Sequence, residues 1–212
     1  MHSLGRWLGG ALLLIACGGA AAGALEDIVH AVNNDDERTV AELLKRGLDV
    51  NTVGPDSESL LMIAARHGRP KMVKIILDGR PRINARNAFG ETALMLATHQ
   101  GHTDVVRQLL AQGAEANHEG WNPLMYAAAQ NRMDIARILI GQGAKINSTG
   151  ENGITALMMS AREGHVGMVL LLLEHGADPS LKNQDGQTAL GLARTQERRD
   201  VVDLLRRAGA TE

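Results

Sequence analysis

The stretch "TALMLATHQGHTDVVRQLLAQGAEAN" (92–117) decides the fold, because it holds two short amphipathic segments divided by a Gly-His pair. Thr92 is suited to begin the first segment, since its side-chain oxygen can accept a backbone N–H that a helix start leaves unpaired. Apolar residues follow at helical spacing from Val105 to Leu110. Gly113 comes next, where a helix commonly ends in a left-handed turn. The stretch therefore predicts two short helices joined by a tight turn.

Six copies of this unit follow one another along the chain. Their first segments are "EDIVHAVNNDD" (26–36), "SLLMIAARHGR" (59–69), "TALMLATHQGH" (92–102), "NPLMYAAAQNR" (122–132), "TALMMSAREGH" (155–165) and "TALGLARTQER" (188–198). Their shared apolar anchors are Ile28, Leu61, Leu94, Leu124, Leu157 and Leu190, separated by 33, 33, 30, 33 and 33 residues. A fixed period of this length indicates a stack of repeated helical units.

The composition agrees with such a stack. Of the 212 residues 44% are apolar but only 2% are aromatic, so small and aliphatic side chains must fill the core. That mixture favours closely packed short helices over a β-sandwich. The formal net charge of −2 gives no strong attraction to nucleic acid. Cys17 is the single cysteine, which excludes a disulfide framework and a thiolate metal cluster in the body of the chain.

The repeated segments resemble the ankyrin repeat, whose pattern T-P-L-H-x-A-A-x-x-G-H, followed by V-x-x-L-L-x-x-G-A-D-V-N, has a period near 33. The resemblance covers residues 25–212. It implies an all-α solenoid of about six helix-turn-helix repeats with projecting hairpin loops, each repeat relying on its neighbours for a core. The repeats are expected at about 25–53, 54–86, 87–116, 117–149, 150–182 and 183–212.

Several positions depart from the family pattern. Methionine replaces the usual histidine in four repeats, which predicts adaptable apolar packing in place of a polar tie. These methionines are Met62, Met95, Met125 and Met158. Arg80 stands where the other second helices have a terminal glycine, so we expect an irregular helix end there. Asp35 and Asp36 replace Gly-His in the first repeat, which is typical of a polar capping repeat.

Residues 1–24 have the features of a signal peptide. Arg6 precedes an apolar run, and Ala22-Gly23-Ala24 fits the small-x-small pattern of a cleavage site. The run is too short and too rich in glycine for a good membrane span. The sequence therefore predicts export to the periplasm and a mature chain with a formal charge of −3.

Two alternatives to cleavage stay open. The segment could act as an uncleaved anchor, or Leu14–Cys17 could be a lipobox in which Cys17 is acylated. Residues 18–24 would then form a flexible tether to a membrane. The small-x-small site and the shortness of that tether favour ordinary cleavage, so we expect membrane attachment only if Cys17 is lipidated.

The sequence holds no convincing catalytic constellation, so we predict a protein that is not an enzyme and needs no cofactor, metal or small-molecule substrate. His102 and His165 occupy the Gly-His position, where a packed structural histidine is the better interpretation. The basic cluster from Arg194 to Arg199 contains Glu197 and precedes Asp200. A solvated cap explains this cluster better than a nucleic-acid site does.

Function is then expected on the surface. The resemblance implies a groove formed by hairpin tips and the open side of the first helices, in which a monomer binds a protein partner. The candidate contacts, carried over by alignment, are Asp56, Glu58, Arg66, His67, Phe89, Glu91, His99, Gln100, Trp121, Ala129, Gln130, Asn152, Ile154, Arg162 and Glu163. A scaffold anchored in the envelope through Cys17 and a secreted effector are the alternative functions.

The fourth repeat carries an unusual hairpin. The interval from Gly113 to Leu124 is 11 residues, whereas the matching intervals on both sides are 14. Trp121 lies beside this gap, and it is one of only three aromatic residues in the predicted mature chain, with Phe89 and Tyr126. We expect Phe89 and Trp121 to be exposed and Tyr126 to lie in the core. Trp121 is then predicted to fill the notch with one face and to offer the other face to a partner.

Overall fold

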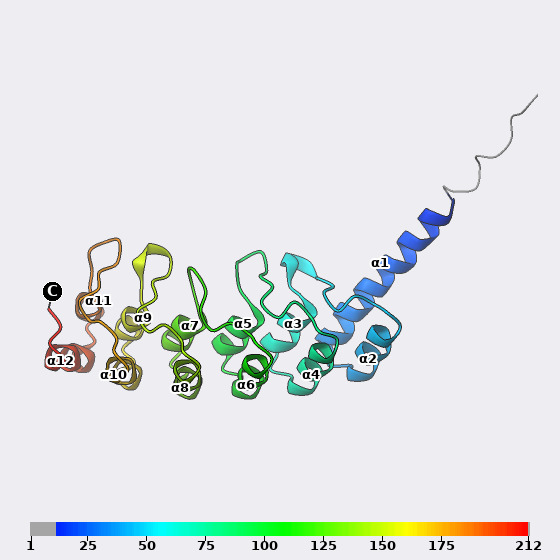
Figure 1. Ribbon diagram of the computed structural model, residues 1–212. Coiled ribbons are helices and arrows are strands. Elements are labelled where there is room, and N and C mark those ends of the chain that lie inside the picture. Colours follow the sequence, from blue (N-terminus) through cyan, green and yellow to red (C-terminus); the bar gives the residue numbers. More distant parts are fainter. Residues whose placement is uncertain (1–11, 212) are drawn as a thin grey trace, which may run out of the picture.

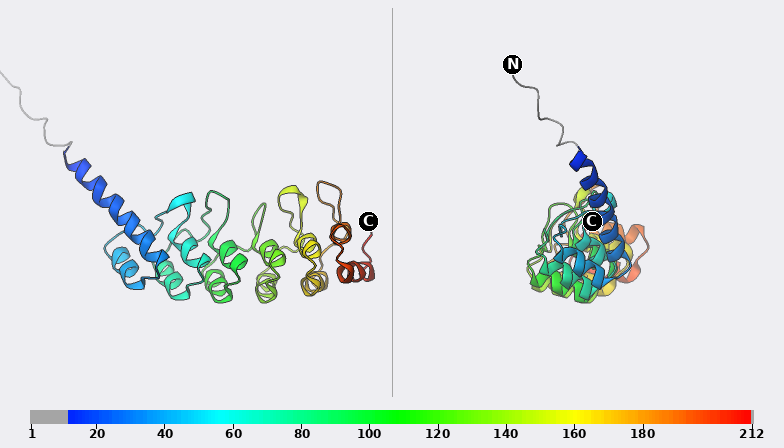
Figure 2. Two further views of the ribbon diagram at one scale, coloured as in Figure 1. Left: turned by 180° about the vertical axis from the view of Figure 1, so that it is seen from behind. Right: turned by 90° about the vertical axis from the view of Figure 1, so that its right-hand side faces the viewer.

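The computed structural model describes residues 12–211, with side chains from residue 23 onward. Its helices form antiparallel pairs stacked side by side in two rows, and long loops project from the side of the first helices (Figure 1). The stack is one helix pair deep along its whole length (Figure 2). The predicted all-α solenoid of helix-turn-helix repeats is therefore confirmed.

Each predicted repeat contributes one helix to each row. The first helices are α1 (Leu12–Asn33), α3 (Leu60–Arg66), α5 (Ala93–Gln100), α7 (Pro123–Ala129), α9 (Ala156–Glu163) and α11 (Ala189–Thr195). The second helices are α2 (Glu37–Lys45), α4 (Pro70–Asp78), α6 (Thr103–Ala111), α8 (Met133–Gly141), α10 (Val166–Glu174) and α12 (Arg199–Arg207). Short 3-10 turns, η1 (Pro55–Ser57) and η2 (Glu151–Gly153), lie in two of the hairpins.

Helix α1 is much longer than the other first helices and leaves the stack at its N-terminal end (Figure 1). Its backbone passes through Ala24 without a break, so residues 18–24 are helical where the lipoprotein alternative expects a flexible tether. Within residues 12–211, no helix has the length and hydropathy that crossing a membrane requires. Residues 1–11 and the side chain of Cys17 lie outside the described part, and the signal peptide stays a prediction.

Five of the six first helices begin at a side-chain cap, as predicted for Thr92. In each cap the side-chain oxygen accepts the backbone N–H three positions later, at 3.1–3.3 Å. These caps are Ser59, Thr92, Asn122, Thr155 and Thr188. The methionines at the third helical position are buried, as expected. Met62 and Met95 also accept the N–H of their own cap at sulfur, at 3.4 Å, so they keep part of the polar role as well.

The second helices end in a left-handed turn. Gly113, with φ of +90°, shows the common form: its N–H donates to Leu110 and the next N–H, of Ala114, donates to Leu109. Arg80 adopts the same turn with φ of +56°, and its N–H donates to the carbonyl of Leu77 at 2.9 Å. The second bond is missing because proline follows Arg80 and has no N–H. The expected irregularity is therefore one missing hydrogen bond, not a different turn.

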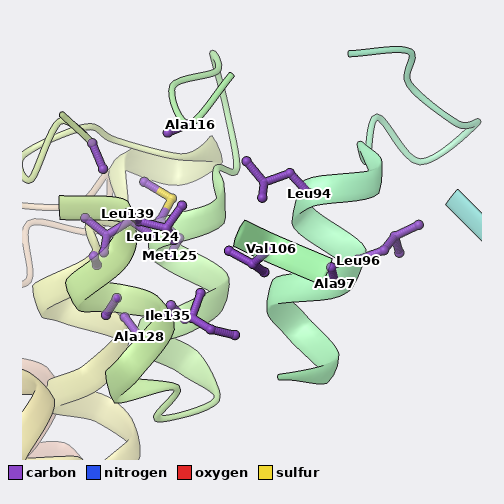
Figure 3. Packing of buried hydrophobic residues seen from close by; sticks show 14 of the residues in the cluster. Leu94, Leu96, Ala97, Val106, Ala116, Leu124, Met125, Ala128, Ile135 and Leu139 are labelled. Carbon is purple, nitrogen blue, oxygen red and sulfur yellow. The ribbon is translucent and has the colours of Figure 1, made fainter. Parts of the chain in front are cut away.

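One continuous apolar core runs through the stack. Small residues such as Ala97 and Ala128 are fully buried, so neighbouring first helices approach closely. Larger side chains from both rows fill the space between them, among them Leu94 and Ile135 (Figure 3). The burial of these side chains against the next repeat, rather than within one repeat, makes the stability of each unit depend on its neighbours.

A regular set of side chains ties each repeat to the one before it. At the position of histidine in the Gly-His pair, an arginine or histidine side chain donates to a carbonyl near the end of the preceding first helix. The pairs are Arg69 to Val32, His102 to Arg66, Arg132 to His99, His165 to Ala129, and Arg198 to Arg162. The predicted structural role of His102 and His165 is thus confirmed, and arginine serves the same role at three junctions.

A second set of ties follows the second helices. Four asparagines, each beyond the end of a second helix, accept a backbone N–H from the segment after the next second helix, at 2.8–2.9 Å. They are Asn51, Asn84, Asn117 and Asn147. The two sets fix the angle between adjacent repeats on both sides of the core, and so hold the projecting hairpins in a row.

Candidate partner-binding site

The projecting hairpins form the rim of the open side. Four of them are closed by a backbone hydrogen bond of 2.8–3.0 Å, as between Gly150 and Ile154. Neighbouring tips are also joined in two places: Ala88 donates to the carbonyl of Asp56, and Gln184 donates to that of Asn152, both at 2.9 Å. The tips of the second and third repeats, and those of the fifth and sixth, therefore form two tied pairs.

The hairpin of the fourth repeat interrupts this rim. It is three residues shorter than its neighbours, and the loop before α7 rises less far than the loops before α5 and α9 (Figure 1). Within residues 12–211, no backbone hydrogen bond joins its tip to the tip on either side. The short hairpin thus leaves a notch between the two tied pairs.

A pocket of about 250 Å³ occupies this notch. The residues that line it come from the third, fourth and fifth repeats, with Arg86 at the end of the second, so the pocket exists only when these repeats are stacked. The lining consists of Arg86, Phe89, Gly90, Glu91, Met95, Glu119, Gly120, Trp121, Tyr126 and Glu151. All three aromatic residues of the predicted mature chain are among them.

Tyr126 belongs to the pocket and not to the core, which corrects the sequence expectation. It occupies the place that Leu96 and Met159 fill in neighbouring repeats, where those side chains are buried. The tyrosine is only half-buried, because its longer side chain reaches out to Glu91 and its hydroxyl donates to Oε1 at 3.0 Å. Burial and the nearby Glu91 charge raise the pKa of Tyr126, so the phenol stays protonated and keeps this bond.

Trp121 is half-buried, so the expectation that it is exposed holds for only part of its surface. Its ring centroid lies 5.3 Å from that of Tyr126, with the planes tilted by 52°. Gly150 of the next hairpin lies beside the indole: a Cβ there would make ordinary van der Waals contact with Cδ1 of Trp121, at 3.6 Å. Trp121 thus packs against the following repeat and also borders the pocket.

Phe89 is the most exposed large apolar side chain of the described part, at 73%, as predicted. The loop that carries it is held by Asn87, whose side-chain oxygen accepts the N–H groups of Phe89 and Glu91 at 3.0 and 2.9 Å. A single exposed apolar side chain is common on protein surfaces, but Phe89 also lines the pocket together with Trp121 and Tyr126.

Carboxylates surround the aromatic rings. Glu91 is held by Tyr126 and by the amide of Asn87, whereas Glu119 and Glu151 are exposed at the rim. Arg86 is the one cation among the described residues that line the pocket. The lining therefore has a formal charge of −2.

The acidic character extends to the second repeat. Burial raises the pKa of Glu58, the nearby Arg66 opposes that shift, and the Glu91 and Asp56 charges add to it. Arg66 approaches Glu58 at 2.8 Å, so these two candidate residues are paired with each other. Negative charge therefore runs along the hairpins from Asp56 toward the notch.

The remaining candidate residues have three kinds of surroundings. His99 lies edge-on to Tyr126, with ring centroids 5.6 Å apart, and so packs against one of the residues that line the pocket. Arg162 and Glu163 pair with each other at 3.0 Å, at the end of α9. The others lie in hairpins or at the ends of first helices: His67, Gln100, Gln130 and Asn152 are exposed, and Ala129 and Ile154 are half-buried.

Family models decide how this arrangement is classified. One, described as ankyrin repeats in three copies, matches residues 61–150 and 145–211. A second, described as ankyrin repeats in many copies, matches residues 28–77. The chain belongs to the ankyrin repeat family. Ankyrin repeats are a module for protein–protein interaction.

Curated relatives share parts of this stack. The chain is 44% identical over 55 residues to human Ankyrin repeat domain-containing protein 29, covering 26% of this chain and 18% of that protein. It is 30% identical over 88 residues to the ankyrin repeat protein YahD of Escherichia coli, covering 40% and 44%. Glycerophosphocholine phosphodiesterase gde1 of Schizosaccharomyces pombe is 35% identical over 91 residues, covering 41% and 8%. The chain spans less than half the length of each of these relatives.

Alignment to the ankyrin pattern missed part of the pocket. Arg86, Glu119, Glu151 and Tyr126 were not among the candidates, because the pattern assigns function to fixed positions in a regular hairpin. The signal that could have found them was the shortened interval before Leu124. A hairpin that is three residues short must expose the flanks of its neighbours.

Proposed function

We propose that this ankyrin repeat chain is a non-enzymatic module of the bacterial periplasm that binds a partner protein through its hairpin tips and the open side of its first helices. The notch at the fourth repeat carries the proposal. It combines an exposed aromatic side chain, a half-buried tryptophan and a charged rim, which are features of interface hot spots. The family's role in protein interaction supports the same function.

The proposal that the chain is exported rests on residues 1–24, whose pattern is that of a signal peptide. The rival form is a scaffold attached to the envelope through an acylated Cys17. Metabolic labelling with a fatty-acid analogue separates the two: we expect no label on the wild-type chain, whereas a label that Cys17→Ser abolishes would establish the anchored form. A secreted effector would instead be recovered outside the outer membrane.

Site-specific photocrosslinking tests the binding surface. A photoreactive phenylalanine analogue at position 89 should capture one protein of defined mass from a periplasmic extract. The same analogue at position 170 is the matched control, because Leu170 is also exposed, at 45%, but lies on α10 in the opposite row of helices. Equal capture at both positions, or capture only at position 170, would contradict the proposed surface.

A further inference from the structure

We propose that the pocket at the fourth hairpin receives an arginine side chain of the partner protein. The inference deepens the proposed function, on which it rests, by naming the chemistry that the partner presents. Three features of the pocket support this inference: its size, its aromatic rings and its carboxylates.

The aromatic rings supply faces on which a flat cation can stack. Tyr126 and Trp121 are adjacent and tilted, and Phe89 stands on the neighbouring hairpin with most of its surface open to solvent. A guanidinium group binds to aromatic faces by stacking and by cation–π attraction, and arginine is used for this purpose more often than lysine. An aliphatic ligand would use the same rings but would leave the surrounding charges unpaired.

The carboxylates supply acceptors on more than one side. Glu91, Glu119 and Glu151 come from three successive hairpins and border the same pocket. Glu91 is already oriented by the hydroxyl of Tyr126 and the amide of Asn87. A guanidinium has five N–H donors arranged in a plane, so it can bond to two carboxylates while its face contacts a ring.

The size of the pocket suits one such side chain. Its volume of about 250 Å³ leaves room for one arginine side chain. The three missing hairpin residues create this space, because the short tip leaves the flanks of Phe89 and Glu151 uncovered. Arg86 opposes the ligand by its own charge, so its removal should strengthen binding.

The test uses short peptides and the fluorescence of Trp121. The full chain carries Trp7→Phe, so that Trp121 is the single tryptophan. Acetylated and amidated five-residue peptides present arginine, citrulline or lysine between glycines, citrulline being the uncharged isostere of arginine. We expect a saturable fluorescence change with the arginine peptide at millimolar concentration, and binding at least tenfold weaker for citrulline and several-fold weaker for lysine.

Matched variants locate the binding. Glu119→Gln with Glu151→Gln should weaken the arginine peptide about tenfold, whereas Glu115→Gln with Glu174→Gln removes the same charge from exposed positions outside the pocket and should leave binding unchanged. Arg86→Gln should tighten binding two- to fivefold. Restoring three glycine-rich residues after Glu119 should abolish binding, because the lengthened tip would fill the notch.

Specific outcomes overturn the inference. Equal affinity for arginine and citrulline, tighter binding of the lysine peptide, or no effect of the paired glutamate variant would each contradict an arginine site. If a partner protein is captured at position 89 despite such a result, the proposed function holds and only the arginine site is contradicted. Arginine binding with no captured partner would instead contradict the proposed function and leave the pocket's chemistry intact.

Discussion

Arg80 holds a left-handed backbone conformation that the equivalent turns give to glycine. For a residue with a Cβ, this conformation costs about 1–2 kcal/mol. A glycine avoids that cost, but it also has more conformational freedom in the unfolded chain, which offsets part of the stabilisation. We expect Arg80→Gly to raise the free energy of unfolding by about 0.5 kcal/mol, measured by urea denaturation.

Gly113→Ala is the matched control for that experiment. It introduces the same penalty at a turn where no atom lies within 4 Å of the added Cβ, so it should cost about 1 kcal/mol from the backbone alone. A lower unfolding midpoint for Arg80→Gly would contradict the account, because it would mean that the arginine side chain contributes more than its backbone costs.

His118 gives a pH-dependent prediction beside the pocket. Burial lowers its pKa below the ordinary 6.5, and the Arg86 charge lowers it further. Because the folded pKa is below the unfolded one, the unfolded chain takes up the proton more readily. This contribution therefore lowers stability as the pH falls from above 6.5 through the folded pKa.

An NMR titration of the His118 ring measures this directly. We expect a midpoint below 6.5 that moves upward in Arg86→Gln, since the variant removes a nearby positive charge. Glu115→Gln is the opposite control: it removes a charge that raises the His118 pKa, so the midpoint should move down. A midpoint at or above 6.5 in the wild-type chain would be inconsistent with the described environment.

At the scale of the elements, each junction depends on a side chain from the following repeat. Arg132 donates to the carbonyl of His99 and passes so close to Gly101 that a Cβ there would lie 2.8 Å from the guanidinium carbon. Gly101→Ala should therefore cost about 1 kcal/mol more than Gly113→Ala, because it also breaks this tie.

A double-mutant cycle with Arg132→Ala separates the two costs. Once Arg132 is gone, Gly101→Ala should cost no more than Gly113→Ala, since only the backbone penalty remains. If Gly101→Ala costs the same with and without Arg132, the added Cβ does not disturb the hydrogen bond from Arg132 to His99, and the account of this junction is wrong.

The helices, their caps and the turn glycines could be predicted from the sequence, because each depends on residues only a few positions apart. Thr92 and Gly113 show this at the two ends of one repeat. The arginine ties and the pocket could not be predicted in the same way. Arg132 and His99 are 33 positions apart, and the pocket depends on three hairpins whose spacing only the stack fixes. Tyr126 was misplaced because its position predicts the core, whereas its hydroxyl requires a polar partner.

At the scale of the whole molecule, the main packing contacts among residues 12–211 join helices of one repeat or of adjacent repeats, so stability should vary along the stack. Helix α6 packs between α4 and α8, whereas α12 has a neighbour of its own row on one side only, α10. We expect amide hydrogen exchange to be slowest in α6 and α8 and fastest in α12, because a terminal repeat can open without its neighbours. One uniform exchange rate in all three helices would contradict this prediction, because it would mean that their amides exchange only when the whole stack unfolds.

The central claim is that the notch at the fourth repeat is where a partner protein binds. The most direct measurement is the affinity of the crosslinked partner, once purified, for the wild-type chain and two double variants. Phe89→Ala with Trp121→Ala should weaken binding by a hundredfold or more, because both aromatic anchors are lost. Val166→Ala with Leu170→Ala, which removes exposed apolar surface from α10, should leave affinity within twofold. Unchanged affinity in the first variant, with its helical fold intact by circular dichroism, would contradict the claim.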